Sequence, residues 1–114
     1  MSVGDIHWVE FPPAGGREQQ ARRPAIIMQD DGYGRGLPTT LVMPLSTAMR
    51  ALRFAGTTSI AASSESGLRQ ESVALVFQFR AIDRDRIRER IGTISETECK
   101  TLLDELRKLT GQKE

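Results

Sequence analysis

Five short apolar runs, each ended by proline, glycine or a polar turn, dominate the first 80 residues of this chain. Runs of this length with turn residues between them are typical of β-strands. We expect strands at 6–11, 25–29, 39–45, 54–60 and 71–80, with an exposed loop at 61–67. The last run alternates most clearly. One face would hold Val73, Leu75, Phe77 and Phe79, and the other Ala74, Val76, Gln78 and Arg80.

The end of the chain carries the pattern of a single α-helix. Ser95 and Glu98 have the spacing of a capping box, in which each side chain bonds the backbone N–H of the other. Gly111 is a natural stop. Between them runs one apolar helical stripe, made of Cys99, Leu102, Leu103, Leu106 and Leu109 or Thr110. The sequence therefore predicts a small, mainly β domain with a docked C-terminal helix.

Two features precede that helix. Asp83 is placed to cap a short helical turn over 83–90, and Ile91 fits a short last strand. The turn alternates Arg84, Arg86, Arg88 and Arg90 with acidic residues, a pattern that favours a solvated, ion-paired surface over an RNA-binding patch.

Length and composition limit the class of protein. A chain of 114 residues is expected to form one domain, 1–114, with a single modest core. No apolar run approaches the ~20 residues that span a membrane, and the N-terminus lacks the basic and apolar regions of a signal peptide. Cys99 is the single cysteine, and no Cys/His cluster offers zinc ligands. We expect a cytoplasmic protein with no metal and no cofactor.

The polar loop at 15–24 is the strongest candidate for a functional segment. It carries Arg17, Glu18, Arg22 and Arg23 and runs into the apolar segment 25–28. Arginine forks, amides and a carboxylate together suit the binding and cleavage of a phosphodiester. Of the 16 basic residues only Lys100, Lys108 and Lys113 are lysine, so 13 are arginine. This bias favours phosphate contacts, although a GC-rich genome would produce it equally well.

Four segments, in this order, resemble the MazF/PemK family, the toxins of bacterial toxin–antitoxin pairs. The first is Gly-Asp-Ile-His-Trp-Val-Glu-Phe at 4–11, and the second is Gly-Arg-Glu-Gln-Gln-Ala-Arg-Arg-Pro-Ala at 16–25. The third is Leu-Val-Met-Pro-Leu-Ser-Thr at 41–47, an apolar strand ending in hydroxyl residues. The fourth runs from 67 to 94 and includes Gly-Leu, Ser-Val and Gln-x-Arg. Together the matches cover roughly 4–111.

The resemblance implies a small SH3-like β-barrel with a C-terminal α-helix, usually a homodimer. It also implies a metal-independent endoribonuclease that cuts single-stranded RNA at short motifs. A cognate antitoxin with a disordered tail would neutralise such a toxin by covering its RNA groove.

The chemistry of such an enzyme uses the 2′-hydroxyl of the RNA as nucleophile. His7 is the only histidine, so a pair of histidines acting as base and acid is excluded, and a strand residue is the better interpretation of His7. The resemblance places the catalytic arginine at Arg23, next to Pro24. A guanidinium can stabilise charge that develops on the phosphate. Because arginine stays protonated to very high pH, proton transfer through it rests on the resemblance alone.

Two further residues complete the proposed catalytic set. Ser46 matches the hydroxyl that contacts the scissile phosphate in the family, and Thr47 would replace it if the register shifted by one residue. Glu18 matches the glutamate of the Gly-x-Glu-Gln loop, and it would orient Arg23 or accept the 2′-hydroxyl proton. The alternatives are a local cap for Ser46 and a surface ion pair between Glu18 and Arg23.

Other residues are candidates for RNA binding. These are Arg17, Gln19, Gln20, Thr47, Arg50, Arg53, Gln78 and Arg80. Gln78 and Arg80 match the Gln-x-Arg of the family and are expected to share a strand face, where a dimer contact is an equally good interpretation. Tyr33 is expected to be the better base-stacking residue, and Trp8 to belong to the core.

Some positions depart from the family pattern. Arg17 replaces the usual serine, Glu10 stands where an aspartate is common, and Phe77 occupies a position that is often acidic, which puts the role of Gln78 in doubt. Two other functions fit the same barrel: a toxin that acts by protein binding, of the gyrase-poison type, and a catalytically inactive relative. Arg23–Pro24 together with Ser46 favours the nuclease.

Overall fold

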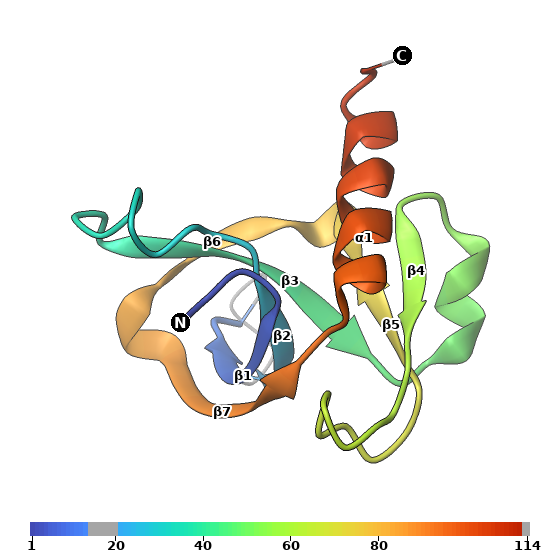
Figure 1. Ribbon diagram of the computed structural model, residues 1–114, viewed down its shortest axis with the longest axis horizontal. Coiled ribbons are helices and arrows are strands. Elements are labelled where there is room, and N and C mark those ends of the chain that lie inside the picture. The colour runs from blue at the N-terminus through green and yellow to red at the C-terminus, as the bar shows by residue number, and fades with distance from the viewer. Residues whose placement is uncertain (14–20, 113–114) are drawn as a thin grey trace.

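The computed structural model describes residues 1–13 and 21–112 of the chain. Its strands are β1 (Asp5–Phe11), β2 (Ala21–Ile27), β3 (Thr39–Ser46), β4 (Thr57–Ile60), β5 (Ser72–Leu75), β6 (Arg80–Asp83) and β7 (Ile87–Thr93). Short 3₁₀ turns are η1 (Met49–Arg53), η2 (Val76–Gln78) and η3 (Arg84–Arg86), and the α-helix is α1 (Glu96–Leu109). The fold is therefore mainly β with one C-terminal helix, as the sequence predicts (Figure 1).

The strands form one antiparallel, seven-stranded sheet in the order β4-β5-β3-β2-β1-β7, with β6 paired to the other end of β3. Among the described strands no ladder joins β4 to β7, so the sheet does not close into a complete barrel. The helix α1 stands beside β4 (Figure 1) and also contacts η2. No helix in the described part of the chain has the length and apolar character that a membrane crossing requires.

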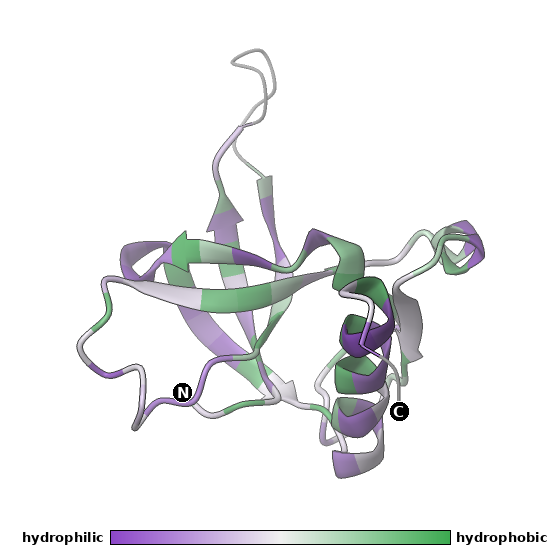
Figure 2. Ribbon diagram, turned by 90° about the horizontal axis from the view of Figure 1, so that it is seen from above, coloured by the Kyte–Doolittle hydropathy of each residue, from purple (hydrophilic) through white to green (hydrophobic). Residues whose placement is uncertain are grey.

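The sheet has a core on each face, because neighbouring residues of a strand point to opposite sides. The helix-side core includes Ile6, Ile26, Met43, Leu45 and Leu102. The second core contains Val9, Phe11, Ala25, Ile27, Val42 and Ile82. The apolar side of α1 faces the sheet and its polar side faces outward (Figure 2).

The predicted helix is confirmed. Ser95 Oγ accepts from the Glu98 amide at 3.0 Å, and Glu98 Oε1 accepts from the Ser95 amide at 3.0 Å. Glu98 Oε2 also accepts from the amide of Ala61, which ties the helix start to the loop after β4. The stripe is buried only in part: Leu102 is fully buried, whereas Leu103 and Leu109 stay exposed.

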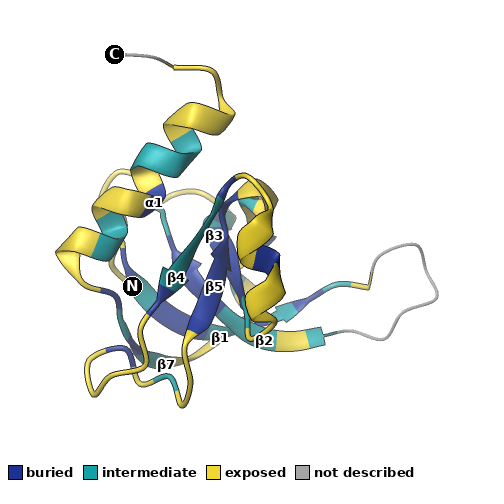
Figure 3. Cartoon of the chain, turned by 90° about the vertical axis from the view of Figure 1, so that its right-hand side faces the viewer, coloured by how far each residue is buried: buried dark blue, intermediate teal, exposed yellow. Residues whose placement is uncertain are grey.

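The prediction of one continuous strand over 71–80 is wrong. The chain leaves β5 after Leu75, turns through η2 and re-enters the sheet as β6. All four residues of β5 are buried, because the strand is covered on both sides, so the alternation there does not mark a single core face (Figure 3). The Phe77 amide instead donates to the Gly56 carbonyl at 3.1 Å. Gln78 and Arg80 therefore do not share a strand face.

Other boundaries also shift. β2 begins at Ala21, four residues before the predicted start, because 21–26 pair with β1 from Phe11 to Ile6. β4 begins three residues later than expected, at Thr57, and β7 is a full strand of seven residues. The turn at 84–86 exists, although Asp83 makes no side-chain cap bond there. The 61–67 loop is exposed except for Ser66.

Candidate functional site

The proposed catalytic arginine lies within a strand rather than in a loop. Arg23 is a half-buried residue of β2 and faces Val9 of β1 across the ladder. Val9 belongs to the second core, and residues opposite each other in an antiparallel pair share a face of the sheet. Arg23 therefore emerges on the face of the second core.

The register between β2 and β3 relates Arg23 to Ser46. The two strands pair as Ala25↔Pro44, Ile26↔Met43 and Ile27↔Val42, and the ladder ends there. Continued by two residues, the same register sets Arg23 opposite Ser46. Pro24 and Pro44 lack an N–H, which accounts for the ladder stopping at this point. The alternation of β3 sends Ser46 to the face of Pro44 and Thr47 to the other face.

Ser46 is the last residue of β3 and pairs with Val73 of β5 on the side away from β2. Its Oγ accepts a hydrogen bond from the Ala48 amide at 3.1 Å, so the local cap considered from the sequence is present. A hydroxyl that accepts one bond keeps its O–H as a donor. This cap fixes the position of the oxygen and leaves the proton available to a bound anion.

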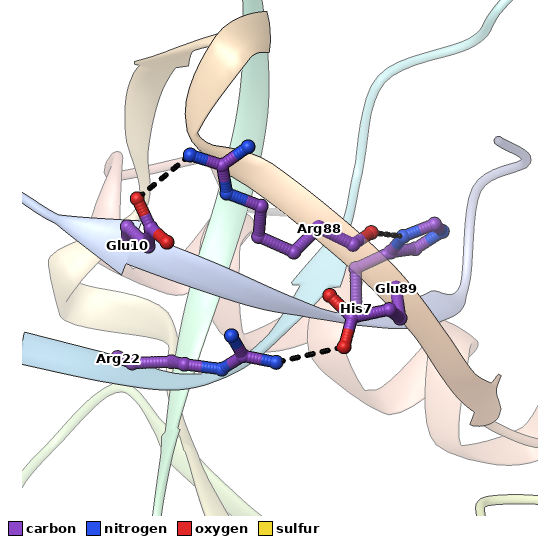
Figure 4. Close-up of polar contacts among 5 residues, drawn as sticks. All are labelled: His7, Glu10, Arg22, Arg88 and Glu89. Atoms are coloured by element: carbon purple, nitrogen blue, oxygen red, sulfur yellow. Dashed lines mark hydrogen bonds and ion pairs between the residues drawn. The ribbon is translucent and has the colours of Figure 1, made fainter.

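Arg22 has a different environment from Arg23, although the two are consecutive. Its guanidinium carbon lies 5.1 Å from the centre of the Trp8 ring, and its Nη2 donates to Glu89 Oε2 at 2.9 Å. Figure 4 shows this contact reaching across β1 to β7. A backbone hydrogen bond at Glu89 and the bond from Arg22 lower the pKa of the Glu89 carboxyl. Arg22 is thus held on the face opposite Arg23.

The remaining arginines of the β7 region hold the surface together. Arg88 pairs with Glu10 at 2.9 Å and Arg90 with Asp5 at 3.5 Å, so their partners are on β1 and not in the Arg/Asp run itself. The hydrogen bond from Arg88 is the main cause of a lowered pKa at Glu10. Arg84 and Arg86 donate mainly to backbone carbonyls of Gly34, Leu37 and Glu10. The predicted ion-paired surface is therefore confirmed for Arg88 and Arg90, but not for Arg84 and Arg86.

Two of the predicted RNA-binding residues lie on η1, the turn that comes after β3. Arg50 and Arg53 are exposed on η1. Arg80 lies on β6 opposite Val42, and its guanidinium carbon is 5.6 Å from the Phe11 ring centre, which places it on the face of Arg23. Gln78 is exposed at the end of η2. Arg17, Glu18, Gln19 and Gln20 lie outside the described residues.

The structure shows where Trp8 and Tyr33, the two candidates for base stacking, lie. Trp8 is half-buried and lines a cleft, so the expectation that it belongs to the core is wrong. Tyr33 is 95% exposed, on a loop held by Asp30 and Arg84.

His7 is buried in β1, and its Nδ1 donates to the Arg88 carbonyl at 2.8 Å, which confirms it as a strand residue. Within the described residues, no group of three or more His, Cys, Asp or Glu side chains is placed to hold a metal ion.

The cleft beside Trp8 encloses about 770 Å³. Its walls come from Trp8 and Pro24, from Thr47, from 67–70 with Ser72, and from 89–91. Sequence reasoning missed 68–70 and Ile91 because they join the other walls only through folding. One signal was available: Gly67–Leu68 is part of the family segment. Gly67 has φ +69°, and a Cβ there would lie 2.3 Å from the Ile91 carbonyl oxygen, so glycine lets this wall approach β7.

Solved structures share the fold over nearly the whole chain. MazF from Deinococcus radiodurans superposes with a TM-score of 0.79 at 24% identity, covering 98% of this chain and 97% of that one. The Mycobacterium tuberculosis toxin MazF-mt6 gives 0.77 at 18% identity, covering 96% and 99%. The architecture is therefore that of MazF-like proteins.

Sequence comparison identifies the family. The chain is 30% identical to the endoribonuclease EndoA of Bacillus subtilis over 88 residues, which are 77% of this chain and 75% of EndoA. It is 28% identical to the endoribonuclease MazF of Staphylococcus saprophyticus over 100 residues, 88% of this chain and 82% of the relative. The family model described as "PemK-like, MazF-like toxin of type II toxin-antitoxin system" matches residues 2–110. The chain belongs to this family.

Proposed function

We propose that this toxin is an endoribonuclease that cleaves single-stranded RNA at specific sequences in the cytoplasm, without a metal ion. The proposal is supported above all by the β2–β3 register, which ends at Ala25↔Pro44 and, if continued by two residues, would set Arg23 opposite Ser46 on one face of the sheet. The names of the relatives support the reaction class, since both are endoribonucleases.

The reaction follows from the RNA's own 2′-hydroxyl. Its oxygen attacks the phosphorus, its proton passes to a base, and the bond from phosphorus to the 5′-oxygen breaks as that oxygen gains a proton. The products are a 2′,3′-cyclic phosphate and a 5′-hydroxyl. Arg23 stabilises the negative charge of the transition state with a charge-assisted fork, and Ser46 donates its O–H to a phosphate oxygen. Glu18 is the proposed base, and Arg23 the proton donor that the family resemblance implies.

Two partners besides RNA belong to the proposal. MazF of Deinococcus radiodurans was crystallised with MazE, and a mycobacterial endoribonuclease with its cognate antitoxin. We expect this chain to bind a cognate antitoxin in the same way. We also expect a homodimer. The apolar residues of β5 and the start of η2 cannot supply its interface, because Val73, Leu75 and Val76 are buried within one chain. We propose that the interface uses the exposed apolar residues Met49, Leu52, Phe54 and Phe77, which we call the η1–η2 patch.

The direct test is cleavage of a long single-stranded RNA in EDTA, with the ends mapped. We expect discrete cuts with 2′,3′-cyclic phosphate and 5′-hydroxyl ends. Arg23→Ala should lose roughly 100-fold or more in rate, the scale of one preorganised donor. Arg23→Lys keeps the charge without the fork and should recover only part of that loss. Arg107→Ala, an exposed arginine of α1, is the matched control. A wild-type protein that cuts no RNA, or an Arg23→Ala variant as fast as wild type, would exclude the mechanism.

A further inference from the structure

The cleft lined by Trp8 lies next to the proposed catalytic pair but belongs to the other face of the sheet. Pro24 and Thr47 line it, and they are the chain neighbours of Arg23 and Ser46. Both sites meet where β2 and β3 separate beyond Ala25↔Pro44. An RNA strand held at Arg23 and Ser46 can therefore reach the cleft by passing over this end of the sheet.

The cleft has the composition of a base-binding site. Trp8, Leu68 and Ile91 supply aromatic and apolar walls. Gln70 and Thr47 supply amide and hydroxyl groups, which can bond the edge of a base. Unstacked bases of single-stranded RNA are held in this way, between aromatic or apolar faces and polar edge contacts. The volume of about 770 Å³ is within the range of small-molecule sites.

The charges around the cleft favour a polyanion over an acidic side chain alone. Arg69 and Arg90 line it, and the one lining carboxylate, Glu89, is bonded to Arg22. Arg69 is exposed and makes no ion pair within the described part of the chain. Arg90 keeps only a long contact of 3.5 Å to Asp5. Arginine can therefore bind phosphate at the rim while a base enters between the walls.

Arg22 prepares Trp8 for this role. Its guanidinium lies over the indole ring. The same guanidinium is held by its ion pair with Glu89 (Figure 4). A ring held in one orientation loses little conformational freedom when a base stacks on it. We propose that this cleft is a nucleobase subsite, in which Trp8, Leu68 and Gln70 hold one unstacked base next to the cleaved bond and Arg69 binds its phosphate. The inference rests on the proposed RNA-cleaving function and adds a determinant of its sequence preference.

Trp8 is the only tryptophan of the chain, so its fluorescence reports on the cleft directly. The probes are 2′-O-methyl hexanucleotides of uridine, cytidine and adenosine, which cannot be cut because the nucleophile is blocked. An abasic 2′-O-methyl hexamer keeps the phosphates and lacks the bases. We expect at least one base-containing hexamer to change the fluorescence at a concentration about tenfold below that of the abasic one. Arg69→Ala and Gln70→Ala should each raise the Kd roughly five- to tenfold, and the control Arg107→Ala should not.

The outcomes separate this inference from the nuclease. If wild type cuts RNA but the abasic hexamer acts as well as the others, or Trp8 does not respond to any hexamer, the subsite is wrong and the nuclease stands. If wild type cuts no RNA, but base-containing hexamers still change the Trp8 fluorescence and Arg69→Ala weakens that response, the subsite stands and the nuclease is excluded. If poly-glutamate produces the same response as the hexamers, the cleft binds acidic peptide and the inference is overturned.

Discussion

The guanidinium of Arg22 lies 5.1 Å from the ring of Trp8, with the two residues on neighbouring strands of one sheet face. The next residue, Arg23, faces Val9 and the second core on the opposite side. A single step along β2 thus separates an arginine that lies over an aromatic ring from the arginine that we propose binds phosphate. At the end of β3, Ser46 and the following residue Thr47 diverge in the same way, since Thr47 lines the cleft beside Trp8.

The first prediction concerns these two hydroxyl residues. Ser46→Ala should lower kcat about tenfold or more, because it removes the donor that we propose acts on the phosphate together with Arg23. Thr47→Ala should leave kcat within about threefold, since its side chain leaves the other face of β3. Single-turnover cleavage of one RNA by both variants at saturating protein measures the difference. A larger loss for Thr47→Ala would show that the register of β3 is shifted by one residue.

The second prediction concerns the wall of the cleft. Gly67→Ala should lower the free energy of unfolding by about 1–3 kcal/mol, because a positive φ strains any L-residue and the new Cβ meets the Ile91 carbonyl. Gly36→Ala is the control, since nothing lies within 4 Å of a Cβ there and its φ is not positive. Urea unfolding of both variants checks the contrast. Equal stability of the two would mean that the wall tolerates displacement and does not depend on Gly67.

These results show which features could be predicted from the sequence. The capping box of α1 could be, because its chemistry is contained in four consecutive residues, Ser95 to Glu98. The break after Leu75 could not, because it depends on a bond from the Phe77 amide to the distant Gly56 carbonyl. The start of β2 was missed because Ala21 to Arg23 resemble a polar loop, and only pairing with β1 makes them a strand.

The candidate site divides in the same way. Arg23 and Ser46 are proposed from local motifs, but choosing Ser46 over Thr47 requires the β2–β3 register, which no local pattern contains. The cleft was missed because its walls come from β1, from the 67–72 segment and from β7. Trp8 resembles a core residue in sequence, but in the fold it lines the cleft together with 67–70.

The third prediction is a pH dependence. The hydrogen bond from Arg88 lowers the pKa of Glu10 in the folded protein, so the folded state favours the carboxylate. A lowered carboxyl pKa contributes stability above the unfolded value of about 4.3, and this contribution is lost as pH falls through the folded value. Glu10→Gln should therefore be less stable than wild type at pH 7, and the gap should narrow below about pH 4. Urea unfolding across this range checks it. A gap that widens on acidification would contradict the assignment.

The last prediction concerns the proposed dimer. In the η1–η2 patch, Phe54 and Phe77 are 60% and 44% exposed, and their rings are in contact edge to face with centroids 6.1 Å apart. Clustered exposed aromatic residues mark association surfaces, and truncating a central aromatic typically costs a protein interface about 2 kcal/mol or more. Phe54→Ser should therefore raise the dimer Kd roughly 30-fold or more. Tyr33→Ser, which removes an even more exposed aromatic from the loop after β2, should leave it unchanged. Light scattering at micromolar concentration measures the oligomeric state of both variants. A monomeric wild type would rule out the dimer. A dimer lost in Tyr33→Ser but kept in Phe54→Ser would place the interface elsewhere.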